Sequence, residues 1–470
     1  MTLRNVLWVP IVAVGSILCW QAAQTTPPKD KNAELYRLFV DAVEHVDRNY
    51  VKEVKREDLI HSAINGMLDN LDPYSNFIPP QNTRQFDQLT KGHYTGIGIT
   101  VEVKDDFTTV IVPKPHSPAY NAGVLAGDRI LAVNGQNVQK KSLNDVIDLL
   151  QAPPGTELKL TVLHKPYNTA PATLMLKTAV ITIESVQGDI HISDDTWDFM
   201  LDKQNKIGYV RISNFVINTT PEFQAAIKSL LAAGMKALVI DLRFNPGGQL
   251  STAIEISDLF VKEGVIVSTK GRNTESRSAT AKSEGTLPDF PVAILVNGLS
   301  ASASEIVAAC LQDHKRAVIV GERTFGKGSV QNVIELDEGE GVGKSILKLT
   351  TASYMRPNGH NIHRFKDAKE SDEWGVKPDA NLEVRLTNEE NQDYFLWRAS
   401  RDTLNTNRAE TMPQADKNPP AKQNDGKQPE GKKAPPRVRE SKTPADKTYN
   451  DKQLNKALEY LKNKLKGSAS

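Results

Sequence analysis

The chain has 470 residues, enough for two or three domains at about 100–200 residues each. Lys and Arg together number 58 and Asp and Glu 57, so the net charge is only +1. This balance excludes a protein that binds nucleic acid or anionic lipid through bulk charge. Recognition must therefore depend on individual sites.

The N-terminus has the pattern of an export signal. Arg4 precedes an apolar run over 6–20, which predicts a signal sequence or a membrane anchor. The run is shorter than the roughly 20 residues of a spanning helix, which favours a signal, but Gln21 disturbs the cleavage site, so cleavage stays open. A lipid-modified Cys19 is a weaker alternative. Cys310 is the only other thiol, so the mature chain has no intramolecular disulfide.

The next segment is predicted to be helical. Apolar residues recur at helical spacing from 35 to 71, which fits two or three helices. Asp72-Pro73-Tyr74-Ser75 ends the last of them, because a proline biases the residue before it away from helical geometry.

A β-rich module follows. Short β-like runs occupy 97–101, 108–112, 129–133 and 157–163, with a helix over 143–150 and an Asn134-Gly135 turn. The module resembles a PDZ domain, with Gly96, Ile97, Gly98 and Ile99 as its carboxylate-binding loop. Ser117-Pro118-Ala119 and the run from Ala122 to Gly135 also carry this resemblance.

From about 187 to 384, strands and helices alternate, which indicates an α/β layer on a mostly parallel sheet. Beyond Arg408 the composition turns polar, charged and proline-rich, which predicts disorder. The last segment carries an amphipathic stripe from Leu454 to Leu465. A short helix of this kind needs a partner surface, either another copy of the chain or its own body.

The segment 292–306, VAILVNGLSASASEI, reads as a buried strand, a tight turn and a helix start. A serine on such a turn is exposed, and the amide after it can face an oxyanion. Ser302 with Glu305 also fits the S-x-x-E capping box, and serine caps greatly outnumber nucleophiles. By itself, this segment favours a helix cap.

A second segment, 321–331, nearly matches the phosphate loop G-x-x-x-x-G-K-[ST]. Gly328 holds the position that requires Ser or Thr, and 329–334 reads as a strand where the phosphate loop opens a helix. ATP binding is therefore not predicted. Lys327 alone would be interpreted as a solvated loop lysine.

Histidine chemistry is the other arrangement to consider. None of His314, His360 and His363 lies in a recognisable motif, and the last two lack the H-E-x-x-H metal pattern. Surface or packing roles are favoured, and neither a metal site nor a cofactor is predicted.

Taken together, these segments resemble the carboxy-terminal processing proteases, a family of tail-specific serine proteases that contain a PDZ domain. The resemblance rests on an ordered set of motifs: Leu71 to Ser75, the PDZ residues, Asp241 to Gly248, Ser300 to Glu305, Phe325 to Gly328, Thr350 to Tyr354 with Pro357-Asn358-Gly359, and Trp374 to Asp379. The family pattern places the nucleophile at Ser302, the lysine twenty-five positions later at Lys327, and a lysine-orienting glutamine at Gln331.

The chemistry is consistent with this assignment. A free lysine, with a pKa of about 10.4, is mostly protonated at neutral pH and needs a dry site to act as a base. The side-chain carbonyl of Gln331 can orient the amine without adding charge. The oxyanion hole would combine the Ala303 amide with one from Gly247 or Gly248. Considered alone, the pair Gly247-Gly248 could equally serve only to form a turn.

The resemblance implies an α/β multidomain protein with an N-terminal helical segment, a PDZ-like β-rich domain and a protease core similar to crotonase and Clp folds. The predicted boundaries are 1–24 signal or anchor, 30–92 helical region, 93–185 PDZ domain, 186–408 protease core, 409–448 disordered linker and 449–466 amphipathic helix.

The implied function is a serine endopeptidase of the bacterial cell envelope, periplasmic and either secreted or tethered to the membrane. Its substrates would be proteins or peptides with apolar C-termini, captured by strand addition at the PDZ groove. A closed, regulatory groove is the alternative, and an adaptor or activator protein fits either arrangement. The rival functions are a catalytically silent or partner-activated PDZ scaffold and a crotonase-like acyl-CoA enzyme, for which no CoA site is apparent.

Overall fold

The computed structural model describes residues 31–193, 196–273, 275–339, 343–402 and 449–467. The predicted signal or anchor segment, 1–24, and the predicted linker, 409–448, lie outside these ranges. Within them, no helix combines the length and apolar character needed to cross a membrane.

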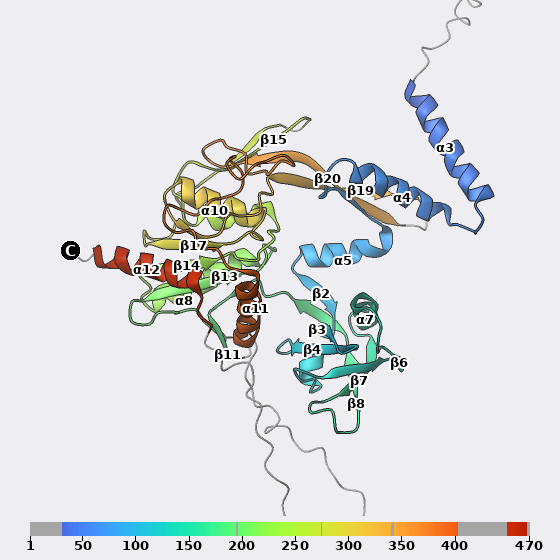
Figure 1. Ribbon diagram of the computed structural model, residues 1–470, viewed down its shortest axis with the longest axis horizontal. Helices are drawn as coiled ribbons and strands as arrows, with labels where there is room; N and C mark the ends of the chain where they lie inside the picture. The colour runs from blue at the N-terminus through green and yellow to red at the C-terminus, as the bar shows by residue number, and fades with distance from the viewer. Residues whose placement is uncertain (1–30, 194–195, 274, 340–342, 403–448, 468–470) are drawn as a thin grey trace, which may run out of the picture. The chain divides into compact units, whose positions relative to one another are not determined.

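Figure 1 shows the arrangement of the helices and strands in the described part of the chain. The helices are α3 (Lys31–Asn49), α4 (Arg56–Asp69), α5 (Pro80–Thr90), α6 (Pro118–Asn121), α7 (Leu143–Leu150), α8 (Thr219–Ala232), α9 (Leu250–Asp258), α10 (Ala303–Asp313), α11 (Asn388–Asp402) and α12 (Lys452–Gly467). The strands up to the core are β1 (Asn76–Ile78), β2 (His93–Gly96), β3 (Ile99–Lys104), β4 (Phe107–Pro113), β5 (Arg129–Val133), β6 (Gln136–Asn137), β7 (Glu157–Leu163), β8 (Ala172–Lys177), β9 (Ala179–Thr182), β10 (Val186–Gln187), β11 (Ile190–Ser193) and β12 (Thr196–Asp198). The remaining strands are β13 (Ile207–Ile212), β14 (Ala237–Asp241), β15 (Val265–Gly271), β16 (Arg277–Thr280), β17 (Val292–Val296), β18 (Val318–Gly321), β19 (Ser329–Asp337) and β20 (Lys344–Met355).

The chain forms two compact units. Of the described residues, one unit contains those from 31 to 80 together with those within 333–349, and the other contains the rest. In the first unit, β1 pairs antiparallel with β20, with Phe77 opposite Leu347, and His61 Nε2 lies 3.1 Å from Glu338 Oε2. The sequence predicted the helices of this unit but not its pairing with a hairpin more than 250 residues away.

In the second unit, the PDZ-like module is a twisted antiparallel sheet in the order β3-β4-β5-β7-β8, with α6 and α7 beside it. Val110, Val124, Ile130, Leu158 and Leu160 are buried in its core. The predicted turn joins β5 to β6: Asn134 and Gly135 both have positive φ, as a two-residue hairpin requires. The PDZ-like fold is therefore confirmed.

The central sheet of the second unit has the order β10-β13-β14-β17-β18, and β13, β14, β17 and β18 run parallel. β14 and β17 are buried along their whole length. Parallel strands covered on both faces read as continuous apolar runs, which is how ALVI and VAILV appear in the sequence.

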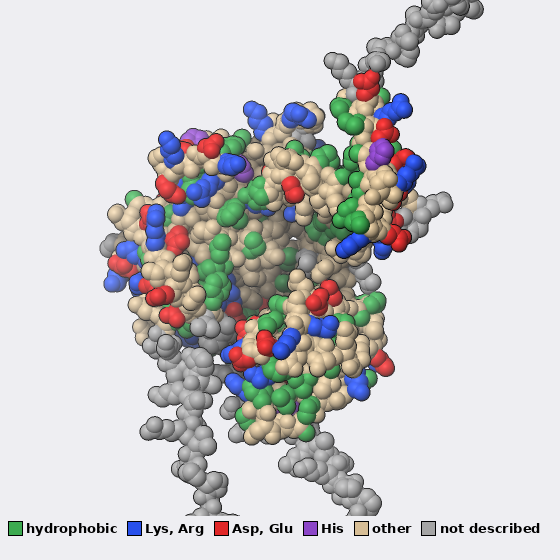
Figure 2. Space-filling model, turned by 45° about the vertical axis from the view of Figure 1, so that its right-hand side comes forward, with side chains coloured by type: hydrophobic (Ala, Val, Ile, Leu, Met, Phe, Trp, Pro, Cys, Tyr) green, Lys and Arg blue, Asp and Glu red, His purple; other side chains and the backbone are tan. Residues whose placement is uncertain are grey.

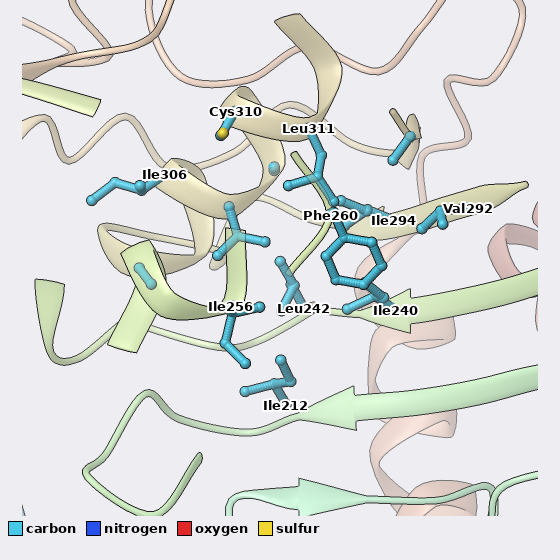
Figure 3. Packing of buried hydrophobic residues seen from close by; sticks show 14 of the residues in the cluster. Ile212, Ile240, Leu242, Ile256, Phe260, Val292, Ile294, Ile306, Cys310 and Leu311 are labelled. Carbon is cyan, nitrogen blue, oxygen red and sulfur yellow. The ribbon is translucent and has the colours of Figure 1, made fainter. Parts of the chain in front are cut away.

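Helices cover both faces of this sheet. On one face, side chains of α8, α9 and α10 pack against alternate strand residues such as Ile240 and Ile294. Figure 3 shows these two strand residues with Ile256 of α9, Phe260 just after it and Leu311 of α10. The intervening residues, such as Val239 and Leu295, point to the other face, where Leu454, Ala457 and Leu461 of α12 are buried against them. The apolar side of the C-terminal helix therefore packs against the body of the same chain.

A buried cluster of charged and polar side chains around Arg243 joins this helix to the core. The Arg243 guanidinium, which is 1% exposed, pairs with Asp241 at 2.6 Å and with Asp451 at 2.8 Å. It also donates to Gln453 Oε1 and lies over the Tyr394 ring. Arg243 comes directly before the loop that leads to Asn245-Pro246-Gly247-Gly248, so the C-terminal helix supports the base of that loop.

The described surface carries mixed charge. Figure 2 shows Lys and Arg side chains interspersed with Asp and Glu over the face in view. This distribution agrees with the near-zero net charge of the chain.

Candidate active site

Three loops meet at the carboxyl edge of the central sheet. The loop after β14 carries Asn245 to Gly248, the turn after β17 carries Ser302, and the loop after β18 carries Lys327. These strands are parallel neighbours, with Ile240 opposite Ile294 and Ile294 opposite Ile319. Because the carboxyl ends of parallel strands lie at one edge, segments up to about 80 residues apart in sequence converge there.

Ser302 occupies a strained position directly before α10. Its φ is +58° and its ψ is −116°, a region that non-glycine residues rarely occupy. The flanking residues are tied to Asn245, whose carbonyl accepts the Ala301 N–H at 3.0 Å and the Ser304 hydroxyl at 3.0 Å. The strand–turn–helix predicted for this segment is confirmed, with β17 ending at Val296 and α10 beginning at Ala303.

The lysine loop packs closely against its surroundings. The Phe325 N–H donates to the Ser300 carbonyl at 3.0 Å, and the Tyr354 hydroxyl donates to the Lys327 carbonyl. A Cβ at Gly326 would come within 2.7 Å of the Arg364 Cβ, and one at Gly328 would collide with the backbone of His363. The glycines on both sides of Lys327 thus permit this loop to pack closely against its surroundings.

A buried carboxylate links the serine turn to the lysine loop. Glu305, which is 0% exposed, accepts the Ser302 N–H and the Lys327 N–H on the same oxygen, Oε2, both at 2.8 Å. Its other oxygen, Oε1, accepts the Gly326 N–H at 2.7 Å and the Thr324 hydroxyl at 2.5 Å. The sequence indicated Glu305 only as a capping-box residue. Its S-x-x-E spacing predicts the bond to Ser302 but gives no sign of the bonds to the lysine loop.

The environment of Glu305 shifts its titration. Burial raises the pKa of its carboxyl group to about 7. The hydrogen bonds from Thr324, Ser302, Gly326 and Lys327 act in the opposite direction, because they stabilise the ionised form.

Gln331 lies on β19, one residue beyond Val330, and is half-buried. Its amide nitrogen donates to Ser329 Oγ at 2.9 Å and to Thr350 Oγ1 at 3.2 Å. These two bonds orient the side-chain amide of Gln331.

The two candidate oxyanion glycines differ in their hydrogen bonding. The Gly247 N–H donates to Asn245 Oδ1 at 2.8 Å, and its carbonyl accepts the Phe215 N–H at 2.9 Å. In contrast, no acceptor for the Gly248 N–H occurs among the described residues. A Cβ at Gly247 would lie 2.7 Å from Ser302 Cβ and 2.9 Å from the Ala303 nitrogen, so this loop lies directly against the serine turn.

The carbonyl groups of the PDZ loop form hydrogen bonds with other residues of the same module. The Ile97 carbonyl accepts the Ala119 N–H at 2.9 Å, and the Gly98 carbonyl accepts the Lys114 N–H at 2.8 Å and the Ser117 hydroxyl at 3.0 Å. In a trans peptide the following N–H points opposite to the carbonyl, so the Gly98 and Ile99 amides face away from these partners. β3, which begins at Ile99, is the end strand of its sheet.

The histidines considered in the sequence have partners of their own. His314 Nε2 lies 2.8 Å from the Val265 carbonyl oxygen, His360 pairs with Glu373, and the His363 ring packs edge-on against Phe365. These contacts agree with the packing and surface roles that were favoured.

Comparison with known proteins identifies the family. Residues 206–382 match the model of peptidase family S41, residues 109–163 that of the PDZ domain, and residues 20–81 that of the activating protease CtpB N-terminal domain. A carboxy-terminal-processing protease of Bartonella bacilliformis is 35% identical over 377 residues, covering 79% of this chain and 80% of that protein. The chain belongs to peptidase family S41.

Other relatives of this S41 peptidase carry similar names. The carboxy-terminal processing protease CtpA of Bacillus subtilis is 32% identical over 377 residues, covering 80% of this chain and 73% of that protein. Among solved structures, the photosystem II D1 C-terminal processing protease is 30% identical, with a TM-score of 0.39, and the match covers 74% of this chain and 92% of that one. The predicted family, fold class and serine-type peptidase activity are confirmed.

Proposed function

We propose that this S41 peptidase cleaves peptide bonds with Ser302 as nucleophile and Lys327 as general base. The observation that carries the proposal is the shared oxygen of Glu305, which binds the backbone N–H groups of both residues at 2.8 Å. The strained φ of Ser302, +58°, supports the assignment, because such conformations persist where surrounding structure enforces them and cluster at active sites.

In the proposed reaction, Ser302 Oγ attacks the substrate carbonyl carbon while its proton passes to Lys327 Nζ. The C–N bond then breaks, and Lys327 returns the proton to the departing amine. Water next attacks the acyl-serine ester and gives a proton to Lys327, which passes it to Ser302 Oγ as that bond breaks. Lysine can accept a proton only when its amine is neutral, so the reaction needs a site that disfavours the charged ammonium form.

The oxyanion of each tetrahedral intermediate would be bound by the amides of Ala303 and Gly248. The Ala303 N–H is at the first position of α10, where helical geometry offers no acceptor. The Gly247 amide is already bonded to Asn245, which favours Gly248 as the second donor. Gln331, held by Ser329 and Thr350, would present its carbonyl oxygen to the Lys327 amine.

The PDZ-like module would deliver the substrate. A peptide adding to the open edge of β3 would find the Gly98 and Ile99 amides directed toward its terminal carboxylate. Proteins with apolar C-termini are the proposed ligands. The N-terminal pattern supports export to the cell envelope, where a regulatory protein partner could act on the same groove.

The proposal is tested by incubating the purified mature protein with a chemically unfolded protein and identifying the products by mass spectrometry. Ser302→Ala and Lys327→Ala should abolish cleavage, because each removes one participant in proton transfer. Ser283→Ala and Lys262→Ala, which change exposed residues of the same types, should retain it. Wild-type turnover in either active-site variant would refute the pair.

A separate measurement tests the PDZ groove. Two fluorescent peptides of the same apolar sequence, one with a free C-terminus and one with a C-terminal amide, are titrated with the Ser302→Ala protein. The free carboxylate should bind at least about tenfold more tightly, because charged hydrogen bonds to backbone amides contribute about 1.5–3 kcal/mol. Equal affinity would refute carboxylate recognition. Specific binding without cleavage by any form would instead support the silent or partner-activated scaffold.

A further inference from the structure

Glu305 makes more contacts than a helix cap requires. In a capping box, the N3 glutamate accepts the N–H of the residue that precedes the helix, as Glu305 does with Ser302. Its three other hydrogen bonds reach 19 to 22 residues along the chain, to Thr324, Gly326 and Lys327. Helix capping does not explain these bonds, which connect α10 to a loop after a different strand.

All four groups act as donors toward this carboxylate. Three are backbone N–H groups, which cannot accept a hydrogen bond, and two of them bond to Oε2. The fourth, the Thr324 hydroxyl, already accepts the Val376 N–H at 2.7 Å while it donates to Oε1. The two carboxylate oxygens offer about four acceptor sites, so this donor set matches an ionised carboxylate.

This geometry couples two backbones. Along the chain, the serine turn and the lysine loop are separated by the whole of α10 and β18. The distance between them therefore depends on noncovalent contacts. With Oε2 2.8 Å from each nitrogen, the Ser302 and Lys327 amides cannot separate without breaking a charge-assisted hydrogen bond in a buried site. The side chains of both residues leave from these restrained backbones.

We propose that Glu305 is a positioning residue that holds Ser302 and Lys327 at the spacing needed for proton transfer between them. The inference rests on the proposed function of that pair. Glu305 acts through the backbone of both residues and takes no proton from the substrate. Thr324 supports it by fixing Oε1.

The test compares Glu305→Gln with Glu222→Gln. In the Glu305→Gln protein, an NH2 group replaces one of the two carboxylate oxygens. Because both oxygens accept hydrogen bonds from donors only, the NH2 group would face N–H or O–H donors and could not bond to them. Glu222 is a matched control: its carboxylate accepts the Ser185 N–H, the Ser185 hydroxyl and the Val186 N–H, and so ties α8 to the segment leading into β10. Both proteins are compared with wild type on a fluorogenic peptide, well below their melting temperatures.

Glu305→Gln should lower kcat by about a hundredfold with KM nearly unchanged, since a shift of about 1 Å between reacting groups can have this effect. The rate at which a fluorophosphonate labels Ser302 should fall in parallel. Glu222→Gln should lower the melting temperature without changing kcat or labelling. A Glu305→Gln protein that loses stability but keeps wild-type kcat and labelling would overturn the proposal, as would a change confined to KM.

Thr324 provides a second route if Glu305→Gln does not fold. Thr324→Ser keeps the hydroxyl donor and should retain kcat, whereas Thr324→Val removes it and should lower kcat by about tenfold. Equal kcat values for these two variants would contradict the proposal. The underlying function is judged separately: cleavage that survives Ser302→Ala or Lys327→Ala refutes the catalytic pair itself, whatever Glu305→Gln does.

Discussion

Replacing Gly247 by alanine should disable the enzyme and destabilise it. The added Cβ would lie 2.7 Å from Ser302 Cβ, 2.7 Å from the Ala301 oxygen and 2.9 Å from the Ala303 nitrogen. These are atoms of a restrained turn, so they cannot move aside as the end of a long side chain can. The φ of Gly247, +103°, adds backbone strain for any L-residue.

The magnitude follows from these two terms. Strained φ values cost about 1–3 kcal/mol and overpacking costs about 1–3 kcal/mol, which together give about 2–6 kcal/mol of destabilisation. Restoring an ordinary Cβ separation of 3.4 Å from 2.7 Å requires a displacement of about 0.7 Å at the serine turn. Because a misplacement of about 1 Å can cost a hundredfold in rate, kcat should fall by about tenfold to a hundredfold.

Gly234→Ala is the matched control. Gly234 also has a positive φ, +82°, but nothing lies within 4 Å of its added Cβ, so only the backbone strain of about 1–2 kcal/mol should appear. Denaturant unfolding and peptide turnover are measured for both variants and wild type. The reasoning is refuted if Gly247→Ala keeps wild-type kcat, or if it loses no more stability than Gly234→Ala.

Three further predictions concern buried groups. Burial raises the pKa of Glu305 from 4.5 to about 7, so between these two pH values the folded state binds more protons than the unfolded state. The free energy of unfolding should therefore fall by about 3 kcal/mol as the pH rises from 4.5 to about 7. Glu305→Gln should flatten that part of the profile in denaturant titrations from about pH 4 to about pH 8, and an unchanged profile would contradict the assignment. Asp451→Asn should lower the free energy of unfolding by about 2 kcal/mol, because it weakens the charged bonds to buried Arg243. Lys456→Ala, which removes a half-exposed ion pair with Glu459 on α12, should lower it by under about 1 kcal/mol, and equal losses would argue against a stabilising role of Asp451. Burial raises the pKa of Cys310 to about 12, so iodoacetamide should modify it only after unfolding, as followed on its tryptic peptide, and rapid modification of the folded protein would oppose this expectation.

Much of the local structure was predictable from the residue pattern. The apolar run 292–296 is β17 with the same bounds, and 129–133, 143–150 and 157–163 are likewise β5, α7 and β7. These elements were readable because apolar periodicity and turn residues act over short distances. The PDZ-like module and the α/β core followed from their order.

The candidate site was only partly accessible in this way. Ser302 and Lys327 emerged from their motifs, but Glu305 appeared as a local cap because its partners at 324–327 are neighbours only after β17 and β18 pair. The choice between the Gly247 and Gly248 amides depends on the direction of Asn245 Oδ1, which no sequence pattern encodes.

By itself, the sequence determined the family, the order of the domains and the residues that carry the proposed chemistry, because these depend on residue type and spacing along the chain. Tertiary structure decided what those residues contact. It brought Arg243 and Asp451 together from positions more than 200 residues apart and buried one face of α12 against the core of the same chain. It also placed one buried carboxylate between the serine turn and the lysine loop, since such contacts arise only when the parallel strands align their carboxyl ends.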